Sequence, residues 1–299
     1  MAKAGKKGNQ KSFITSLVFF VAIVAVILGR FNKSFDSVHV AVAEINEPCA
    51  HFINVGQGSS VLLQSGKTGI LVDAGEKEYG ESVVRYIKSC GVETLDYVVA
   101  THPHTDHIGG LATVLKSFNV GAVIMPRLTA ENTPTTKTYQ SLLETIAERK
   151  IKLIAAKPKN KYSAGKISLE ILGPVTQTDD LNNMSVVCKA DVNSTTFLLL
   201  ADAEKPEMKS IMSLSPNLSC DILLMGHHGS RTSLESSFLR SAAPNLAVIS
   251  CGKGNSYDHP HKEVIDYLTK NNIRYYRTDK SGNIAVICSD NGYSVKTNK

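Results

Sequence analysis

Short apolar runs of strand length alternate along most of the chain with polar turns and with segments long enough for a helix. VLLQS, GILV, YVVA and VGAVIM fall in the first half, and FLLLA, DILLM and LAVIS fall in the second. The runs are rich in Val, Ile and Leu and are separated by glycine or polar residues, which is typical of β-strands. This alternation predicts a mixed fold of the α/β or α+β class, built in layers.

The two halves of this pattern resemble each other. Each half has a hairpin that ends in an aspartate, a helical stretch, a strand that ends in a histidine, a second helical stretch and a further strand. The aspartates are Asp73 and Asp202, and the histidines are His102 and His227. We expect the halves to stack sheet on sheet with helices outside, as a four-layer sandwich. The four side chains would then meet at one edge, where strand ends converge.

The first thirty residues differ from the rest. Residues 1–11 carry four lysines and no acid, and residues 12–29 are an uncharged run of 18 residues, just long enough to cross a bilayer as a helix. This predicts a basic cytoplasmic tail over 1–11, a single-pass transmembrane anchor in the cell membrane over 12–29, a linker over 30–47 and an extracytoplasmic folded domain over 48–294. A cleaved signal peptide is the alternative, but its one cleavage candidate, AVA, lies more than ten residues beyond the apolar run.

The net charge changes its meaning when it is divided along the chain. The total is +6, yet residues 1–33 hold six Lys/Arg and no Asp/Glu, so the remainder has 27 basic and 27 acidic residues. The folded part therefore has no overall field that favours a polyanionic partner. One local exception is RKIKLIAAKPKNK at 149–161, which is either a phosphate-steering patch or a solvated loop between the halves.

The six cysteines show no CxxC spacing, and four of them lie in apolar runs. We therefore expect buried thiols. An extracytoplasmic location would permit disulfides, but the spacing does not say which cysteines would pair.

The sequence HPHTDH at 102–107 crowds three histidines and an aspartate directly behind the run YVVA. Imidazoles and carboxylates are the ligands that hold a divalent cation when no thiolate is used. His102 and His104 can face one ion, and Asp106 and His107 can face a neighbouring ion from the next turn. Without a cation these groups would be poorly paired, at a cost of about 1–3 kcal/mol each. A histidine-rich surface loop is the alternative, but it leaves the echo in the second half unexplained.

The second half supplies further candidates at equivalent places. Asp202 ends the run FLLLAD and is predicted to bridge two ions rather than to cap a helix. His227 directly continues a strand and is the expected ligand, whereas His228 would contact substrate or pack. Asp73 either orients the metal ligands or is a turn carboxylate before Gly75.

Two polar segments are candidates for substrate contact. In NSYDHPH, the side chains of Asn255, Tyr257 and His259 could donate hydrogen bonds to a substrate oxyanion, with helix capping as the alternative. Ser230 follows the histidine pair and could bind an anion at a helix amino terminus or cap the helix. His51 is isolated, so we expect it to be structural or exposed.

Six motifs occur in one order: VGQG, LVDAG, THPHTDHIGG, FLLLADAE, LMGHHGS and NSYDHPH. Together they resemble the metallo-β-lactamase superfamily, and more narrowly the soluble metallo-β-lactamase domain of ComEC-type competence proteins. The resemblance runs from about residue 49 to residue 287 and implies an αββα sandwich with a hydrolytic metal centre. In the competence branch it also implies a proposed nuclease for incoming DNA. The metal positions that it implies are His102, His104, Asp106, His107, Asp202 and His227.

The chain departs from that family pattern at several positions. Asn54 and Ser59 flank VGQG where the branch commonly has aspartates, and Ala201 stands where a glycine usually precedes the bridging aspartate. Where many members have a further metal histidine, the chain has NNMS, so Asn183 and Ser185 are only weak candidates for contact with the metal shell or substrate. This predicts that one ion is loosely held or absent. The channel of full competence proteins is not seen, so we expect DNA translocation to need a separate DNA-uptake channel as partner.

Metal-assisted hydrolysis is the predicted reaction, with one or two Zn²⁺ ions, or Mn²⁺ as the alternative. Such ions lower the pKa of bound water to about 7 and so supply hydroxide at neutral pH. Asp106 would orient the hydroxide, and His228, Tyr257 or His259 would stabilise the developing charge. By analogy with the competence branch, the expected substrate is a phosphodiester of extracellular or incoming DNA.

Two other functions are compatible with the sequence. A hydrolase of small esters, amides or cell-wall material would share the metal site without a surface that steers phosphates. A non-catalytic, membrane-tethered binding module would not need the ligand set, so it predicts that His102→Ala and Asp202→Ala leave function intact.

Overall fold

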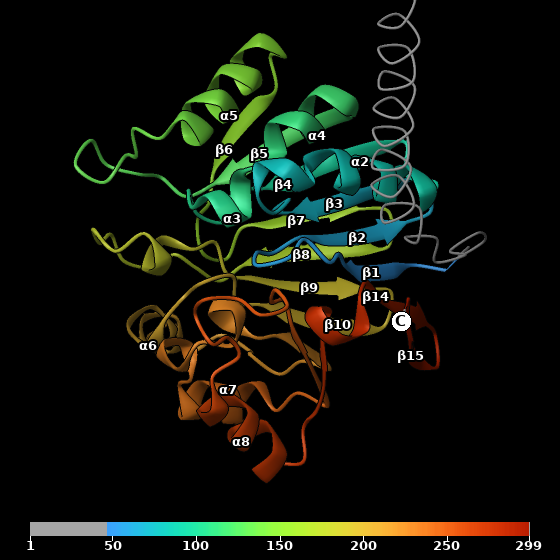
Figure 1. Ribbon diagram of the computed structural model, residues 1–299, viewed down its shortest axis with the longest axis vertical. Helices are drawn as coiled ribbons and strands as arrows, with labels where there is room; N and C mark the ends of the chain where they lie inside the picture. The colour runs from blue at the N-terminus through green and yellow to red at the C-terminus, as the bar shows by residue number, and fades with distance from the viewer. Residues whose placement is uncertain (1–46, 299) are drawn as a thin grey trace, which may run out of the picture. The chain divides into compact units, whose positions relative to one another are not determined.

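The computed structural model describes residues 47–298. Within them the strands form one sheet of eight and one of seven, which pack face to face with helices along their outer surfaces (Figure 1). The predicted four-layer sandwich is therefore confirmed for these residues.

The first sheet contains both ends of the described segment. Its strand order is β15-β14-β1-β2-β3-β4-β5-β6. The strands are β1 (Cys49–Phe52), β2 (Val61–Ser65), β3 (Thr68–Val72), β4 (Thr94–Val99), β5 (Asn119–Met125), β6 (Lys152–Ala155), β14 (Ile284–Ser289) and β15 (Gly292–Thr297).

The second sheet is built from the middle and later parts of the chain. Its strand order is β13-β12-β11-β10-β9-β8-β7. The strands are β7 (Lys161–Ala164), β8 (Ile167–Ile171), β9 (Cys188–Val192), β10 (Thr195–Leu199), β11 (Ile222–Leu224), β12 (Leu246–Ile249) and β13 (Arg274–Arg277).

The helices connect the parallel strands and cover the sheets. The α-helices are α2 (Gly80–Ser89), α3 (Thr105–Ile108), α4 (Leu111–Ser117), α5 (Lys137–Glu148), α6 (Lys205–Ser213), α7 (Ser236–Ala242), α8 (Lys262–Lys270) and α9 (Thr278–Ser281). Short 3-10 turns are η2 (Lys77–Tyr79), η3 (Asn182–Met184), η4 (Gly226–Gly229) and η5 (Arg231–Ser233). In Figure 1 helices α2 to α5 lie on the first sheet and α6 to α8 lie on the second.

The internal repeat predicted from the sequence is visible in the topology. In the first sheet the hairpin β2–β3 leads into the parallel strands β4, β5 and β6, and in the second the hairpin β9–β10 leads into the parallel strands β11, β12 and β13. Parallel strands end at the same edge of a sheet, and this edge carries the sites of α/β folds. The segments that follow β3, β4, β10 and β11 are therefore the ones that build the site.

The main core lies between the two sheets. The rings of Phe52 and Phe197, one from each sheet, are fully buried with centroids 6.4 Å apart. A second cluster, which includes Met208, Phe238 and Leu268, packs helices α6 to α8 against the outer face of the second sheet. Strands buried on both faces explain the continuous apolar runs in the sequence. All six cysteines are buried and free, as the sequence predicts.

The predicted tail (1–11), transmembrane anchor (12–29) and most of the linker (30–47) lie outside the described residues. Within residues 47–298, no helix combines the length and the apolar character that a membrane crossing requires. The described strands begin at Cys49, and the last strand runs to Thr297.

The basic run at 149–161 is divided by strand β6. Its side chains are exposed, but Arg149, Lys150 and Lys152 lie at the amino end of the strand, whereas Lys157 and Lys159 follow its carboxyl end. Because β6 runs parallel to β5, these two groups lie at opposite edges of the first sheet. The run therefore does not form the single patch that the sequence allowed.

Candidate metal centre

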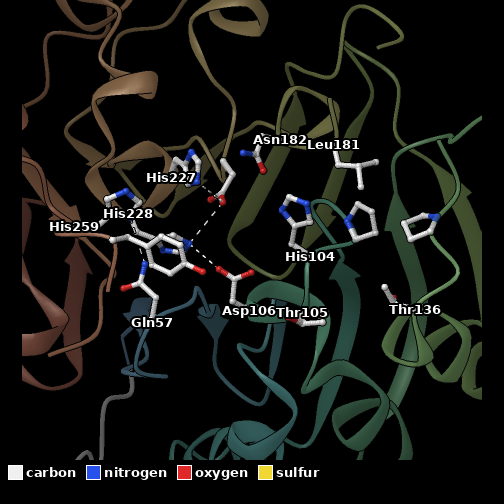
Figure 2. Close-up of a pocket in the computed structure, with 14 residues that line it drawn as sticks. Gln57, His104, Thr105, Asp106, Thr136, Leu181, Asn182, His227, His228 and His259 are labelled. Carbon is white, nitrogen blue, oxygen red and sulfur yellow. Dashed lines mark hydrogen bonds and ion pairs between the residues drawn. The ribbon is translucent and has the colours of Figure 1, made fainter. Parts of the chain in front are cut away.

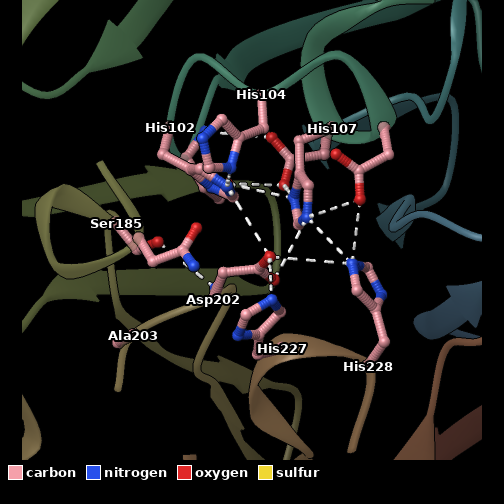
Figure 3. A network of polar contacts seen from close by, with 12 residues as sticks. His102, His104, His107, Ser185, Asp202, Ala203, His227 and His228 are labelled. Atoms are coloured by element: carbon pink, nitrogen blue, oxygen red, sulfur yellow. Dashed lines mark hydrogen bonds and ion pairs between the residues drawn. The ribbon is translucent and has the colours of Figure 1, made fainter. Parts of the chain in front are cut away.

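The HPHTDH segment lies between strand β4 and helix α4, and α3 is a single turn within it (Figure 3). Backbone hydrogen bonds join it to the loop after β3: Ala74 donates its N–H to the His107 carbonyl, and Gly110 donates to the Gly75 carbonyl. A Cβ on Gly110 would lie 2.4 Å from the Ala74 carbonyl oxygen. The glycine after the histidine segment is thus required because two backbones approach closely here.

Asp73 fixes the orientation of His107. The Asp73 carboxylate is buried and accepts hydrogen bonds from the Thr101 backbone N–H at 2.9 Å, from the Thr101 hydroxyl at 2.7 Å and from His107 Nδ1 at 2.7 Å. Because His107 donates through Nδ1, its Nε2 lone pair faces the interior of the site. The structure thus brings Asp73 to the position that the predicted orienting role requires.

The orientation of His102 follows from the same chain of contacts. The Thr101 hydroxyl has one proton, which it gives to Asp73, so it accepts a hydrogen bond from His102 Nδ1 at 3.1 Å. The His102 Nε2 atom therefore carries the lone pair, and it lies 3.0 Å from His104 Nδ1. Two ring nitrogens at this separation face the same small volume.

His228 is held in the same way from the second half of the chain. Its Nδ1 donates to the Ser250 carbonyl at 2.9 Å, and its Nε2 lies 3.1 Å from Asp106 Oδ2 and 3.3 Å from His107 Nε2. The ring is buried, and both of its nitrogens are committed. This geometry places His228 among the donor atoms, not at the substrate contact that the sequence left open for it.

Two groups of donor atoms converge and share Asp202 (Figure 3). Within each group all the donor atoms lie within 4.8 Å of one another. This is the arrangement expected from the sequence, with two neighbouring cation positions and an aspartate between them. The first group is His102, His104 and Asp202, and the second is Asp106, His107, Asp202 and His228.

The residues present fit divalent cations. Asp202 Oδ1 is buried without a hydrogen-bond partner among residues 47–298, which is costly for a carboxylate. Since His107 and His228 both donate through Nδ1, their Nε2 lone pairs face each other at 3.3 Å, an unfavourable contact unless a positive charge lies between them. Imidazole and carboxylate donors are the set that suits such cations.

The electrostatics of the cluster favour positive charge. Burial alone would raise the pKa of the Asp202 carboxyl, but the charges of His107 and His228 hold it well below its ordinary value. Burial likewise opposes ionisation of Asp106, and the hydrogen bond from His228 lowers its pKa. Burial, followed by the charge of His107, lowers the pKa of His102. The carboxylates are thus ionised and His102 is neutral at pH 7, the forms in which they bind metal.

The structure reverses the expected places of His227 and His228. The sequence favoured His227 because it continues a strand, but both histidines lie in the turn η4 with left-handed φ angles of 49° and 55°. Successive side chains in such a turn project in different directions, so the strand does not fix which one enters the site. His227 instead places Nδ1 3.1 Å from Glu204 Oε1, with its Nε2 3.7 Å from Asp202 Oδ2.

The NNMS segment supports Asp202 from behind. The Asn183 side-chain oxygen accepts hydrogen bonds from two backbone N–H groups at the start of α6, at 3.1 and 3.3 Å, and its amide nitrogen donates to Asp180. This saturates the amide as a helix cap, so the weak contact with metal or substrate expected of Asn183 is not seen. The Ser185 hydroxyl accepts from the Asp202 backbone N–H at 3.2 Å and so positions that residue.

His259 meets Gln57 across the molecule. Gln57 Oε1 accepts the Gly252 backbone N–H at 2.9 Å, which turns its amide nitrogen toward His259 Nδ1 at 3.4 Å. Burial, and then the charges of His228 and His227, lower the pKa of His259 to about 4. A neutral His259 that accepts at Nδ1 has its proton on Nε2, so it can donate a hydrogen bond as predicted.

The remaining predicted contacts divide into one exposed ring and two closed loops. Tyr257 is 62% exposed and stacks on His259, with ring planes 25° apart. The Asn255 amide donates to the carbonyls of Gly252 and His259 and accepts two backbone N–H groups, so it has no donor left for an oxyanion. The Ser230 hydroxyl caps the turn η5 by accepting from the Thr232 N–H, which matches the capping alternative.

Two residues that the sequence did not single out contribute to the site. Gln57 lies within the VGQG motif, but nothing in its spacing indicated a partner 202 positions away. Glu204 pairs with His227 and stands in the segment AEKPEM, which reads equally well as a helix start. Only the proximity of Glu204 to Asp202 in the sequence was available as a signal.

The donor groups lie in a cavity of about 410 Å³ at the shared edge of the sheets (Figure 2). Both halves of the chain supply its walls. The lining residues include Gln57, His104, Asp106, Thr136, Asn182, Asp202, His227, His228, Tyr257 and His259.

The sequence matches the family model described as the metallo-beta-lactamase superfamily over residues 53–253. The chain is 29% identical to "ComE operon protein 3" of Bacillus subtilis (strain 168), over 78% of this chain and 32% of that protein. It is 28% identical to "Competence protein ComA" of Neisseria gonorrhoeae, over 79% and 32%. It is 30% identical to "Recombination protein 2" of Haemophilus influenzae, over 78% and 28%. The chain thus spans about a third of the length of these curated relatives.

Solved structures share the fold at low sequence identity. CmlA, a diiron beta-hydroxylase from Streptomyces venezuelae, superposes with a TM-score of 0.55 at 12% identity, over 82% of this chain and 55% of that chain. The metallo-beta-lactamase fold protein YhfI from Bacillus subtilis gives 0.50 at 18% identity, over 77% and 96%. The family match, the two-sheet fold and the donor groups at the shared edge agree, and the chain belongs to the metallo-beta-lactamase superfamily, with competence-related proteins among its relatives.

Proposed function

We propose that the protein is a metal-dependent hydrolase that cleaves phosphodiester bonds of DNA. The observation that carries the proposal is the pair of donor groups that share Asp202 in a cavity of about 410 Å³. Divalent cations bound there would polarise a phosphoryl oxygen and lower the pKa of water to about 7. We put Zn²⁺ first and Mn²⁺ second, because the donors are mainly imidazoles with carboxylates.

The chain's own residues divide the work between them. His102, His104, Asp106, His107 and Asp202 supply the donor atoms, with His228 as the further ligand. Asp106 has its carboxylate at the cavity wall, where it can orient an attacking water. His259 donates from Nε2 to the developing charge on phosphate.

The relatives favour DNA as the substrate. Their printed names refer to competence and recombination, and the similarity covers about four fifths of this chain. With the membrane anchor expected over residues 12–29, the domain would act outside the cytoplasm beside a separate DNA-uptake channel. The neutral charge balance of the folded part means that local contacts must bind the substrate, since no overall field does.

The full chain, loaded with Zn²⁺ or Mn²⁺, is assayed on end-labelled linear duplex and single-stranded DNA, with a chromogenic ester as the comparison. We expect cleavage of DNA that His102→Ala and Asp202→Ala each reduce about 100-fold or more, because each removes a donor. Elemental analysis is expected to show less bound metal in both variants. Asp266→Asn, an exposed carboxylate on α8, is the control.

The outcomes separate the alternatives. Cleavage of the ester without cleavage of DNA under either metal would replace the nuclease with a hydrolase of small substrates. Full activity in both donor variants would favour a non-catalytic binding module.

A further inference from the structure

A second hollow adjoins the metal-bearing cavity. It has a volume of about 400 Å³, and Gln57 belongs to the walls of both. Gln57 thus forms the partition between a space that holds the donor groups and a space that does not. The second hollow is lined by Asn54, Gly56, Gln57, Tyr79, Gly252, Lys253, Asn255 and Asp279.

Lys253 gives the second hollow a positive charge. Its side chain is exposed in the loop between β12 and α8, and no carboxylate within residues 47–298 forms an ion pair with it. The acid in the same wall, Asp279, is bound by the Arg277 guanidinium at 2.7 and 2.9 Å, which offsets its charge. An anion in this hollow would therefore meet an ammonium group beside polar amides.

Tyr257 presents an aromatic face on the same loop. The side chain is 62% exposed, lines the metal-bearing cavity and is supported from behind by His259, with centroids 5.6 Å apart and planes at 25°. A large exposed ring that is held in place by a stacked neighbour is a platform for an unpaired base. The four hydrogen bonds of Asn255 fix the loop that carries both Tyr257 and Lys253.

We propose that this loop forms a second nucleotide subsite, in which Lys253 binds the phosphate next to the one being cleaved and Tyr257 stacks on the unpaired base. The inference rests on the proposed function and narrows its substrate to single-stranded oligonucleotides that reach from the donor groups past Gln57 to Lys253. Base pairing in a duplex would hide the face that Tyr257 needs.

The subsite is tested by comparing two substrates in the metal-loaded full chain. One is a single-stranded decadeoxynucleotide, and the other is bis(4-nitrophenyl) phosphate, which has no second nucleotide. We expect Lys253→Ala to lower the ratio of kcat/KM on the oligonucleotide to kcat/KM on the small ester about 10-fold, and to weaken the salt dependence of oligonucleotide cleavage by about one charge. Lys152→Ala, at the amino end of β6 on the opposite edge, is the matched control.

Tyr257 is tested by its ring and its hydroxyl separately. Stacking predicts that Tyr257→Phe keeps cleavage of the oligonucleotide, whereas Tyr257→Leu loses about 10-fold in kcat/KM. An equal loss in both variants would assign the hydroxyl, not the ring, and would overturn the stacking part of the proposal.

Binding distinguishes failure of the subsite from failure of the proposed function. Anisotropy of a labelled oligonucleotide in the presence of a chelator measures affinity without catalysis, and Lys253→Ala is expected to raise Kd about 10-fold. If wild type cleaves neither substrate but Lys253→Ala still weakens binding, the nuclease proposal fails and the subsite stands. An unchanged ratio and an unchanged Kd in Lys253→Ala overturn the subsite.

Discussion

The histidines of the donor groups keep their orientation through the ring nitrogen that faces away from the site. His107 donates to a carboxylate, His102 to a hydroxyl and His228 to a backbone carbonyl. Each contact places the proton on Nδ1, so that Nε2 is left as a donor atom for a cation. Side chains that form no part of the donor groups therefore decide whether the groups can bind metal.

Asp73→Asn tests this dependence with little change of shape. Residue 73 has a left-handed φ of 59°, which asparagine tolerates, and an asparagine can still accept from the Thr101 N–H. Its amide, however, would donate to His107 Nδ1 and move the imidazole proton to Nε2, where it blocks the donor atom. We expect metal affinity to fall about 10- to 100-fold, measured by titration of the apoprotein with Zn²⁺ and by elemental analysis.

An exposed carboxylate provides the comparison for Asp73. Asp266→Asn on α8 also removes one negative charge but contacts no ligand, so its affinity should equal that of wild type. If Asp73→Asn bound metal as tightly as Asp266→Asn, the orienting role of Asp73 would be wrong.

Most donor residues could be named from the sequence, because HPHTDH places several ligands within one turn of chain. The choice between His227 and His228 could not, since it depends on left-handed backbone angles in a turn. The roles of Asn183 and Asn255 were also out of reach. Local sequence shows that an amide is polar, but not that neighbouring backbone groups already saturate it.

Among the elements, the inner strands of the two sheets join the halves of the chain. Phe197 on β10 is fully buried against Phe52 on β1, and both belong to the core between the sheets. A cavity at this place removes contacts from both sheets at once, because close-packed interiors relax only partly.

Phe197→Ala is therefore expected to lower the free energy of unfolding by about 3–5 kcal/mol, measured by urea denaturation. Leu153→Ala on the edge strand β6 serves as the control, since its side chain is 50% exposed and its loss should cost about 0.5 kcal/mol or less. Similar losses in both variants would contradict the placement of the core between the sheets.

The elements themselves were largely predictable, because hairpins, helical stretches and apolar strands have distinct periods. The distribution of charge over them was not. The run at 149–161 reads as one basic patch, but an intervening strand carries its two parts to opposite edges of a sheet.

For the whole molecule, a buried neutral histidine makes stability depend on pH. His51 is fully buried between the Gln64 side-chain oxygen, at 2.9 Å, and the Tyr86 hydroxyl, at 3.1 Å. Burial lowers the pKa of His51 to about 4. Between the unfolded pKa of about 6.5 and this value, the unfolded chain binds a proton that the folded chain does not. Stability is therefore full above pH 6.5 and falls as the pH drops through this window, by about 3 kcal/mol in all.

Urea unfolding of wild type and His51→Phe at pH 7 and pH 4.5, with chelator present, measures this contribution. Other titrating groups are common to both proteins, so they cancel in the comparison. We expect wild type to lose about 2–3 kcal/mol more than His51→Phe over this range. Equal losses would mean that His51 does not carry the effect.

The sequence by itself determined the order of strands and helices, the repeat of two halves and the ligand-rich segments, because these follow from local periodicity and residue chemistry. Only the tertiary structure decided which atoms meet across long separations. His107 faces His228 from 121 positions away, and Gln57 turns its amide to His259 from 202 positions away. Such pairs depend on the register and stacking of two sheets, which bring distant loops to one edge and which no local pattern specifies.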